Sequence, residues 1–533
     1  MSSSGRRQLR LGALGAVLVA SLWAAAPAGA RVLLVDASPP PRHHDHGSHK
    51  HRYTTIQDAV DAARPGDWIL IAPGDYHERG DRSPAHVPTD EAGAGVMITT
   101  PRIHLRGLDR NRVVVDGTLP GSPRCSSAAA DQDLGPAGPD GRPLGRNGVE
   151  VFKASGVTVE NLTACNFLDG AGGGGNQIWF NGGDGSGTIG MGRYRGAWLS
   201  ATSTFYGGQG APAGSYGIFA SNAGGPGLLA DTYASNMDDS SYYIGACPDC
   251  NAVLTRGHAE NSALGYSGTN SGGHLIIERS EWDQNKTGIV TNSQNNDDAP
   301  SPQDGRCPGT QRSCTFFRHN DIHDNNNPNV PSSGTASLGP PGTGIVVAGG
   351  RYDTVSDNRI THNGAWGVLT VPFPDDSTPP LDTPSHCQGG TLNFVTACYY
   401  DDWANEVTGN RFDGNGFFGN PANGDMGDIS GQHDPGNCFH DNHGANGAAP
   451  TSAPGDLQAT HGTCGVPNQG AGLSDPLTAQ VICATEAFGP CPPKPGMSYP
   501  RATQVQMLPL PRQRSMPDPC DDVPGNRWCE DDD

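Results

Sequence analysis

Paired acids are the residues of this sequence best suited to catalysis. Asp238/Asp239 and Asp297/Asp298 follow a short segment that repeats along the chain, and Asp375/Asp376 and Asp401/Asp402 lie further on. Two carboxylates that flank a glycosidic bond can hydrolyse it, one as acid and the other as base or nucleophile. Carboxylate and amide oxygens are also the ligands that calcium prefers. The pattern is compatible with carbohydrate chemistry, with calcium as a candidate cofactor, but acids of this kind are more often solvated loop residues.

Basic side chains near these acids can move protons. The candidates are Arg256, His258 and Lys286. A β-elimination needs a base beside an acidified carbon, and a hydrolysis needs a proton donor for the leaving group. We therefore expect the catalytic residues, if the protein is an enzyme, to come from Asp238, Asp239, Asp297, Asp298, Arg256, His258 and Lys286.

Aromatic residues form a second candidate set, for binding. The set comprises Tyr242, Tyr243, Tyr266, Trp282, Tyr400 and Trp403. Aromatic faces stack on sugar rings, so these residues are predicted to bind a polysaccharide. The alternative is that they pack in the core, and we expect this for at least half of the set.

A histidine-rich tract, RHHDHGSHKH, occupies residues 42–51. Its histidines are His43, His44, His46, His49 and His51. Imidazole binds zinc, copper or nickel, so a transition metal is a candidate ligand here. No fixed Cys/His spacing defines a closed zinc site, and a flexible polar leader remains the alternative.

The composition limits what the chain can do. The 533 residues carry a formal net charge of -21, which argues against nucleic acid or an anionic membrane surface as partner. Only 35% of the residues are hydrophobic, whereas Gly numbers 76 and Pro 45. So much glycine disfavours helices, while short Val/Ile/Leu runs recur. A β protein with many turns accounts for both observations.

The first residues are typical of an export signal. Arg6, Arg7 and Arg10 precede an apolar run, and Ala28–Ala30 provides small residues for cleavage near Ala30. The 14 cysteines all follow this site, which predicts disulfides and a secreted, periplasmic or cell-surface protein. Cys247 and Cys250 are expected to form a structural disulfide. No later segment is apolar enough to span a membrane.

A repeat organises the middle of the chain. Segments such as LTRGHAEN, IERSEWDQN, FRHNDIHDN and VSDNRITHN end at Asn261, Asn285, Asn325 and Asn363, and a further one ends at Asn415. Each is followed by a short glycine-containing strand, as in GIVT and GIVVAGG. This spacing predicts a solenoid in which stacked asparagines bond to one another and to the backbone. Inserted loops at about 292–313, 327–342 and 370–402 are expected to leave one side of the solenoid.

The opening of the ordered part has a recognisable pattern. In residues 53–78, Ile56, Ala59, Val60 and Ala63 predict a short helix capped by Thr54 or Thr55, and WILIAPGDY predicts a strand and a turn. This opening resembles that of right-handed parallel β-helix proteins of the pectin-lyase-like superfamily. The resemblance implies an all-β fold and an activity similar to that of a polysaccharide lyase or glycoside hydrolase, or a metal-handling role similar to that of NosD-like proteins. The catalytic motifs of polygalacturonases and alginate epimerases are not matched.

The expected organisation has four parts. Residues 1–30 form the signal peptide, 31–52 a His-rich leader, 53–442 the parallel β-helix, and 443–533 an irregular, disulfide-rich cap and tail. The expected function is binding or degradation of an extracellular polysaccharide, and the alternatives are a non-catalytic adhesive solenoid and a metal-handling accessory protein. The sequence does not predict the oligomeric state.

Overall fold

The computed structural model gives a description of most of the chain. It describes residues 29–37, 52–80, 89–293, 314–374, 391–392, 397–431, 435–467, 475–485 and 498–529. The predicted catalytic acids Asp297 and Asp298 lie outside these residues. So do the predicted signal peptide up to residue 28 and the metal-binding candidates His43, His44, His46, His49 and His51.

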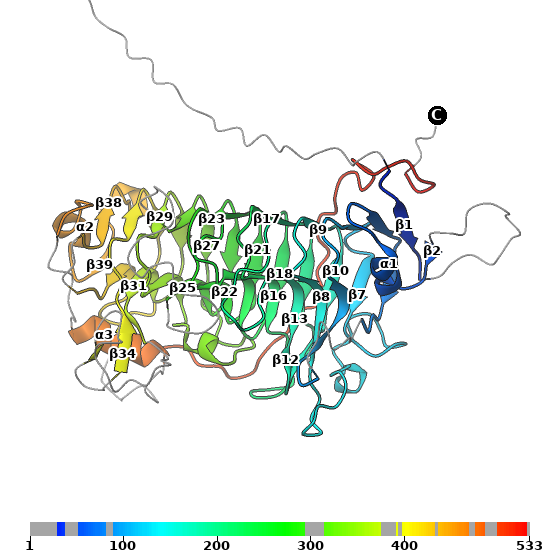
Figure 1. The fold of residues 1–533 in the computed structure, drawn as a ribbon. Coiled ribbons are helices and arrows are strands. Elements are labelled where there is room, and N and C mark those ends of the chain that lie inside the picture. The colour runs from blue at the N-terminus through cyan, green and yellow to red at the C-terminus, as the bar shows by residue number, and fades with distance from the viewer. Residues whose placement is uncertain are drawn as a thin grey trace, which may run out of the picture.

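Three long parallel sheets, A, B and C, wind into an elongated solenoid, with one strand of each sheet in most coils (Figure 1). Sheet A comprises β2 (Arg52–Tyr53), β1 (Val32–Val35), β3 (Trp68–Ile71), β6 (His104–Gly107), β9 (Val157–Glu160), β14 (Tyr194–Ala197), β17 (Gly227–Ala230), β20 (Ala252–Thr255), β23 (Leu275–Glu278), β26 (Thr315–Arg318), β29 (Thr354–Ser356), β35 (Glu406–Thr408) and β38 (Cys438–His440). Sheet B comprises β4 (Gly74–Tyr76), β7 (Val113–Asp116), β10 (Thr163–Cys165), β15 (Ser200–Thr202), β18 (Tyr233–Ser235), β21 (His258–Glu260), β24 (Glu281–Asp283), β27 (Asp321–His323), β30 (Arg359–Thr361) and β36 (Arg411–Asp413). Sheet C comprises β5 (Gly93–Ile98), β8 (Arg146–Phe152), β13 (Asn176–Asn181), β16 (Tyr216–Ser221), β19 (Ser240–Gly245), β22 (Leu264–Thr269), β25 (Thr287–Asn292), β28 (Thr343–Ala348), β31 (Trp366–Val371), β37 (Gly424–Asp428) and β39 (Ser452–Ala453).

The remaining elements are short. Antiparallel pairing joins β11 (Asp169–Gly170) to β12 (Gly173–Gly174), and β34 (Ala397–Tyr400) to β32 (Phe373–Pro374) and β33 (Thr391–Leu392). The helices are α1 (Ile56–Ala62), α2 (Leu457–Thr460) and α3 (Asp475–Thr485). Among the described residues no helix is long and apolar enough to cross a membrane.

The register of successive coils fixes which side chains face the interior. Leu254 pairs with Ile277 in sheet A, and Ala259 pairs with Trp282 in sheet B. Side chains alternate along a strand, so these residues point inward together and form one continuous apolar core. The helix α1 covers the N-terminal end of this core, and Thr55 caps it by accepting a hydrogen bond from the N–H of Asp58. The parallel β-helix and its capping helix are therefore confirmed.

Asparagine ladders hold the coil corners. The amide of Asn285 donates to the side-chain oxygen of Asn325 (3.1 Å), and Asn325 in turn donates to Asn363 (3.2 Å). Each side chain also bonds a backbone carbonyl, so the buried amides are satisfied without a ligand. The structural reading of the repeated asparagines is confirmed. A second ladder, which the repeat analysis does not single out, runs at the A-to-B corner through Asn320, Asn358, Asn410 and Asn442.

Three expectations about organisation were wrong. The predicted leader contains β1, whose apolar residues Val32–Val35 pair with β3 as part of sheet A. The solenoid also continues beyond residue 442, because β39 pairs with β37. The loops do not share one side: those after β25 and β31 leave sheet C, whereas the loop at 327–342 follows β27 of sheet B. Equal loop spacing in sequence does not identify the corner from which a loop leaves.

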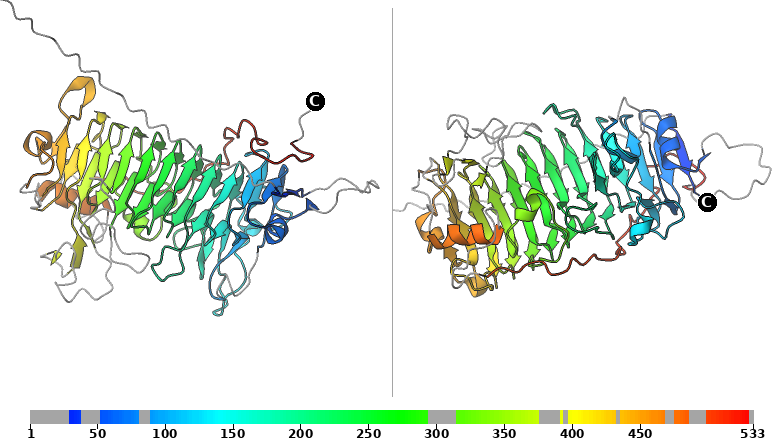
Figure 2. Two further views of the ribbon diagram at one scale, coloured as in Figure 1. Left: turned by 45° about the horizontal axis from the view of Figure 1, so that its top comes forward. Right: turned by 90° about the horizontal axis from the view of Figure 1, so that it is seen from below.

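The C-terminal residues 498–529 run back along the solenoid toward its N-terminal end (Figure 2). This segment, which we name the strap, bonds the outer sides of the asparagines. Asn329, Asn261, Asn236, Asn161 and Asn111 all contact it. At its end, Trp528 packs near Leu34, Trp68 and Leu70 of the first coils. The predicted irregular tail is thus an ordered element that joins both ends of the solenoid.

Disulfides fasten several loops to the solenoid. Cys125 bonds to Cys165 of β10, and Cys438 of β38 bonds to Cys464. The predicted Cys247–Cys250 bridge is present, and Cys520–Cys529 closes the end of the strap. These bonds are typical of proteins that mature in an oxidising compartment.

Candidate functional site

A row of aromatic side chains lies on the outer face of sheet C. The cross-strand pairs Trp179↔Phe219 and Phe219↔Tyr243 place them in one column on β13, β16 and β19. Their neighbours in sequence, Ile178 and Ile218, point into the core, so the row points outward. The rings of Trp179 and Phe219 are parallel, with an angle of 1° and centroids 5.1 Å apart. Trp179 and Phe219 therefore stack face to face and are partly exposed, whereas Tyr243 is buried and meets Phe219 edge to face.

A buried carboxyl group stands at one end of this row. Glu150 of β8 pairs with Trp179 in the same column. Its carboxyl oxygens accept hydrogen bonds from Asn181 (2.9 Å) and Asn147 (3.1 Å). Burial raises the pKa of Glu150 to about 7, although the two amides oppose this rise. A carboxyl group with such a pKa can give or take a proton near neutral pH.

Asp238 and Asp239 lie at the corner that leads into β19. The hydroxyl of Tyr216 donates to Asp239 (2.9 Å), and the hydroxyl of Ser240 donates to the other oxygen (2.6 Å). Burial raises the pKa of both acids, that of Asp238 to about 7. Since the ring of Tyr216 stacks on Phe219 (4.6 Å), Asp239 is linked directly to the aromatic row. The predicted acid pair therefore adjoins sheet C.

Most of the predicted binding aromatics are inside the protein. Tyr242, Tyr266 and Trp282 are fully buried, and Trp282 meets the other two rings edge to face at 5.6 and 6.1 Å. They occupy inward positions of their strands and fill the core, so they cannot touch a polymer. Their assignment to substrate binding was wrong. Tyr243 is the member of the set that joins the aromatic row.

Tyr400 and Trp403 lie elsewhere, beside Arg351. The Arg351 guanidinium lies 5.5 Å from the ring centre of Tyr400 and 5.6 Å from that of Trp403. Tyr400 is buried, whereas Trp403 is partly exposed and meets Tyr352 edge to face. Both aromatics therefore contribute to a packed cation–π cluster near the C-terminal coils and not to the row on sheet C.

The predicted proton handlers do not converge on Asp238 and Asp239. Arg256 pairs with Asp231 at the A-to-B corner (2.7 Å). His258 lies on the outer face of sheet B, where its Nε2 lies 2.7 Å from Asp283. Lys286 donates to the carbonyl of Ser337 in the loop at 327–342. Arg256 and His258 thus lie at another corner and on another sheet than the acid pair, whereas Lys286 lies at the same B-to-C corner two coils further along.

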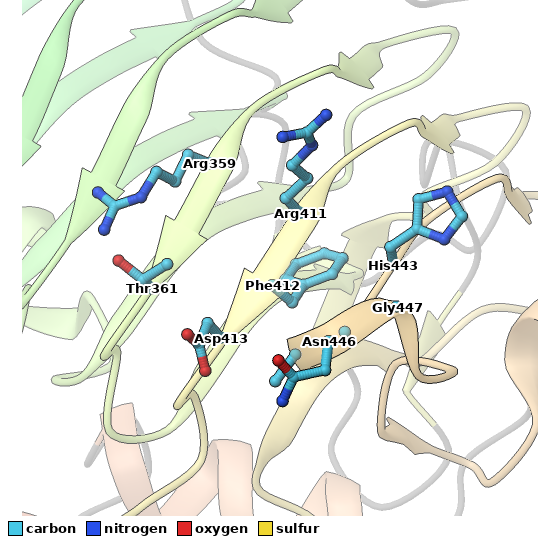
Figure 3. A pocket seen from close by; sticks show the side chains of 10 residues that line it. Arg359, Thr361, Arg411, Phe412, Asp413, His443, Asn446 and Gly447 are labelled. Atoms are coloured by element: carbon cyan, nitrogen blue, oxygen red, sulfur yellow. The ribbon is translucent and has the colours of Figure 1, made fainter.

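At least two cavities border the described part of the solenoid. One, of about 560 Å³, lies over the last strands of sheet B and is lined by Arg359, Arg411, Asp413, His443 and the turn that follows (Figure 3). The other, of about 930 Å³, lies between the strap and the loops at 206–209 and 328–341, with Tyr206, Lys286 and Tyr499 in its wall. Neither contains the aromatic row.

The sequence patterns do not single out Trp179, Tyr216, Phe219 or Glu150. Each belongs to a strand whose side chains point alternately inward and outward: NQIWFN, YGIFAS or RNGVEVF. The sequence signal for such a site is an aromatic residue at an outward position. The signal is weak because the inward positions of the same strands are also apolar or aromatic.

Neither the family models nor the curated proteins give a match to the sequence. Among solved structures, the A-module of mannuronan C-5 epimerase AlgE4 from Azotobacter vinelandii is similar, with 14% identity and a TM-score of 0.42 over 73% of this chain and 90% of that one. An alginate lyase from Paenibacillus sp. has 12% identity and a TM-score of 0.29 over 72% and 95% of the chains. The tailspike of Escherichia coli bacteriophage HK620 has 10% identity and a TM-score of 0.36 over 71% and 54%. With its three sheets of in-register parallel strands, this chain is a parallel β-helix protein.

Proposed function

We propose that this protein binds an extended extracellular polysaccharide along the outer face of sheet C. The observation that carries the proposal is the stacked, partly exposed pair Trp179 and Phe219, continued by Tyr243 in one column. Aromatic side chains pack against the apolar faces of sugar rings, and a column that crosses successive strands suits a linear polymer.

Polar groups beside the row supply hydrogen bonds. The indole of Trp179 donates to Ser221 (3.0 Å), and Asn181 and Asn147 surround Glu150. Sugar hydroxyls are both donors and acceptors, so amides and carboxyl groups next to a stacking platform provide orientation. The predicted export signal and the disulfides support an extracellular polymer as the ligand.

The acids beside the row support chemical modification of the bound polymer, of lyase or hydrolase type. Glu150, Asp238 and Asp239 all have pKa values raised by burial, which suits proton transfer near neutral pH. Glu150 and Asp239 flank the aromatic row, so either acid is a candidate to act on a sugar stacked there. Calcium, with carboxylates as ligands, is the proposed cofactor to include in the assay.

A binding and activity panel tests the proposal. The protein is titrated with uronate-containing and neutral polysaccharides, and each mixture is assayed for unsaturated products and new reducing ends, with and without calcium. We expect Trp179→Ala and Phe219→Ala each to weaken binding about tenfold or more, because each removes one aromatic ring from the row. Glu150→Gln and Asp239→Asn are expected to abolish any turnover while binding remains.

Phe417→Ala is the matched control. Phe417 is 57% exposed and lies in the loop between β36 and β37, several coils from the aromatic row on β13, β16 and β19, so its loss should leave binding unchanged. Equal binding by the wild type and Trp179→Ala would contradict the proposed site. Binding without product in either assay would make the protein a binding solenoid and not an enzyme.

A further inference from the structure

A cluster of histidines and acids lies on the outer face of sheet B, separate from the aromatic row of sheet C. Its centre is His258 of β21 with Glu281 and Asp283 of β24. His258 Nε2 lies 2.7 Å from the Oδ1 atom of Asp283. One donor atom from each of the three residues lies within 4.8 Å of the other two. Three potential metal ligands therefore converge on one point of the surface.

The strands hold these donors rigidly. His258 pairs with Glu281 and Glu260 pairs with Asp283 in the parallel register, while Ala259 and Trp282 between them are buried in the core. The side chains of His258, Glu281 and Asp283 are 30%, 51% and 15% exposed, so the cluster is accessible to an ion from solvent. Ligands placed on regular strands keep their spacing better than ligands placed on loops.

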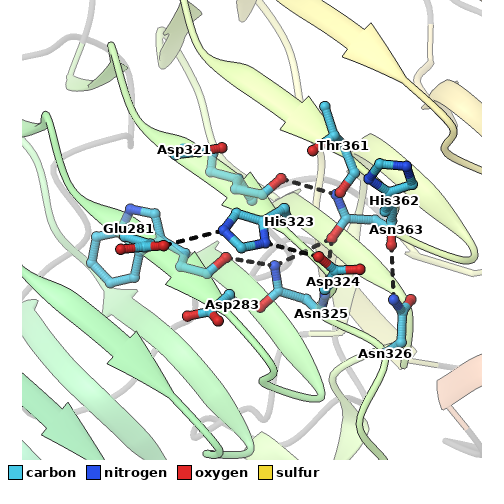
Figure 4. Close-up of polar contacts among 12 residues, drawn as sticks. Glu281, Asp283, Asp321, His323, Asp324, Asn325, Asn326, Thr361, His362 and Asn363 are labelled. Carbon is cyan, nitrogen blue, oxygen red and sulfur yellow. Dashed lines mark hydrogen bonds and ion pairs between the residues drawn. The ribbon is translucent and has the colours of Figure 1, made fainter.

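The cluster continues onto the next strand through His323. Its Nε2 lies 3.3 Å from Glu281, and its Nδ1 lies 2.9 Å from Asp324 (Figure 4). A carboxylate on the far ring nitrogen fixes the orientation of an imidazole, as it does around many protein-bound metals. His323 therefore holds Glu281 in place from the side opposite His258.

Among the described residues, the two carboxylates of the cluster centre have histidine partners but no lysine or arginine partner. Glu260 accepts a hydrogen bond from Tyr233 (2.6 Å), and Asp321 pairs with Arg359 (2.7 Å). By contrast, in the described part of the chain no lysine or arginine forms an ion pair with Glu281 or Asp283. Their neighbours of opposite charge are the histidines, which are also metal ligands. Two carboxylates held side by side in this way attract a divalent cation.

We propose that His258, Glu281 and Asp283 form a binding site for a divalent transition-metal ion, with zinc as its representative. Tetrahedral zinc bonds to nitrogen and oxygen of 2.0–2.1 Å place neighbouring donors about 3.3 Å apart, a spacing between the 2.7 Å contact and the 4.8 Å limit of the cluster. Three protein ligands leave a fourth position for water or for a group of a bound partner. The ion would join β21 to β24.

Titration of the full chain with Zn²⁺ tests the site. The leader histidines His43, His44, His46, His49 and His51 are first replaced by asparagine, so that they contribute no binding. The resulting parent is titrated by calorimetry, and Co²⁺ is used in parallel because its visible absorption reports its coordination. We expect one bound ion, and affinity reduced at least tenfold by His258→Gln, Asp283→Asn or Glu281→Gln, with loss of the Co²⁺ spectrum. Glu281→Gln tests the site even if the other variants fold poorly, because Glu281 is half exposed.

His440→Gln is the matched control. His440 also has two acidic neighbours, Glu406 and Asp441, each at 2.9 Å, but they lie at opposite ring nitrogens and cannot bind one ion together with it. This variant should bind Zn²⁺ like the parent. Equal affinity of the parent and His258→Gln would overturn the proposal, and so would binding of Ca²⁺ alone. Trp179→Ala should keep metal binding, so failure of this site and failure of the glycan site are separate results.

Discussion

The side chain of Asn236 forms a two-way contact with Leu508 of the strap. Its amide donates to the Leu508 carbonyl (2.9 Å), and its oxygen accepts from the Leu508 N–H (3.0 Å). Since 272 residues separate the two, this pair connects the end of the chain to the middle of the solenoid. The asparagines of the corners therefore hold the strap on their outer side as well as one another along the ladder.

Loss of the Asn236 side chain should release part of the strap. Asn236→Ala removes both bonds to Leu508, and we expect the free energy of unfolding to fall by roughly 1 to 3 kcal/mol. Limited proteolysis followed by mass spectrometry should show faster cleavage around residue 508. The control is Gln504→Ala, because this strap side chain makes no hydrogen bond among the described residues. This variant should be cleaved at the wild-type rate. Unchanged cleavage in Asn236→Ala would contradict a strap held by this contact.

Substitution of an asparagine in the second ladder should lower the free energy of unfolding more than substitution of an exposed residue beside it. Asn358 donates to Phe317 and Asn410 and accepts from both nitrogens of Asn320. Asn358→Ala leaves buried polar groups unpaired, so chemical denaturation should show a loss of roughly 3 kcal/mol or more. The adjacent Arg359→Gln, which removes an exposed ion pair, should cost less than about 1 kcal/mol. Similar losses in both variants would contradict a structural role for the ladder.

The raised pKa of Asp353 should make the free energy of unfolding depend on pH. This acid takes the ladder position whose next members are Asn405 and Asn437, and burial raises its pKa to about 7. The folded chain therefore keeps a proton that the unfolded chain releases between about pH 4 and 7, and the unfolding free energy falls as the pH rises through this window. Above the folded pKa the penalty is constant.

Asp353→Asn should remove that penalty. An amide needs no proton to be neutral, so the variant should gain roughly 2 to 4 kcal/mol over the wild type at pH 8, because one pKa unit corresponds to about 1.4 kcal/mol. At pH 4 the two proteins should be similar. Thermal melts at both pH values measure the difference, and an equal gain at pH 4 and pH 8 would rule out ionisation of Asp353 as the cause.

A variant of Trp282 can distinguish a role in core packing from a role in ligand binding. Because its ring is fully buried against Tyr242 and Tyr266, Trp282→Leu should lower the unfolding free energy by roughly 2 to 4 kcal/mol. The affinity of the folded variant for a polysaccharide should match that of the wild type, whereas Trp179→Ala should show the opposite pattern. Weakened binding by folded Trp282→Leu would restore this residue to the binding set.

The repeated asparagines show how far local patterns predict this fold. The spacing of Asn261, Asn285, Asn325 and Asn363 identified the coils, because each coil must place the same turn residue at the same corner. The capping helix followed equally directly from the spacing of Ile56, Ala59 and Val60 and from Thr55. These features are repeated or local, and a short window of sequence contains all of their information.

The candidate site was predictable only in part. Asp238, Asp239 and Tyr243 were identified from type and position, and the structure places the two acids at the corner before β19 and Tyr243 in the aromatic row of sheet C. Tyr242 next to Tyr243 was assigned to the same role, yet it points into the core. Neighbours on a strand face opposite ways, and an aromatic pair does not reveal which member is inside.

The sequence by itself determined the solenoid, its asparagine corners and its N-terminal cap, because the same local energetics recur in each coil. Only the tertiary structure decided which side chains meet across coils. Glu150 joins Trp179 and Phe219, and His258 joins Glu281 and Asp283, through parallel register and loop length. The position of the strap also depends on the tertiary structure, since its hydrogen-bond partners lie hundreds of residues away in sequence. Such contacts depend on how coils stack, and that information is spread over the whole chain.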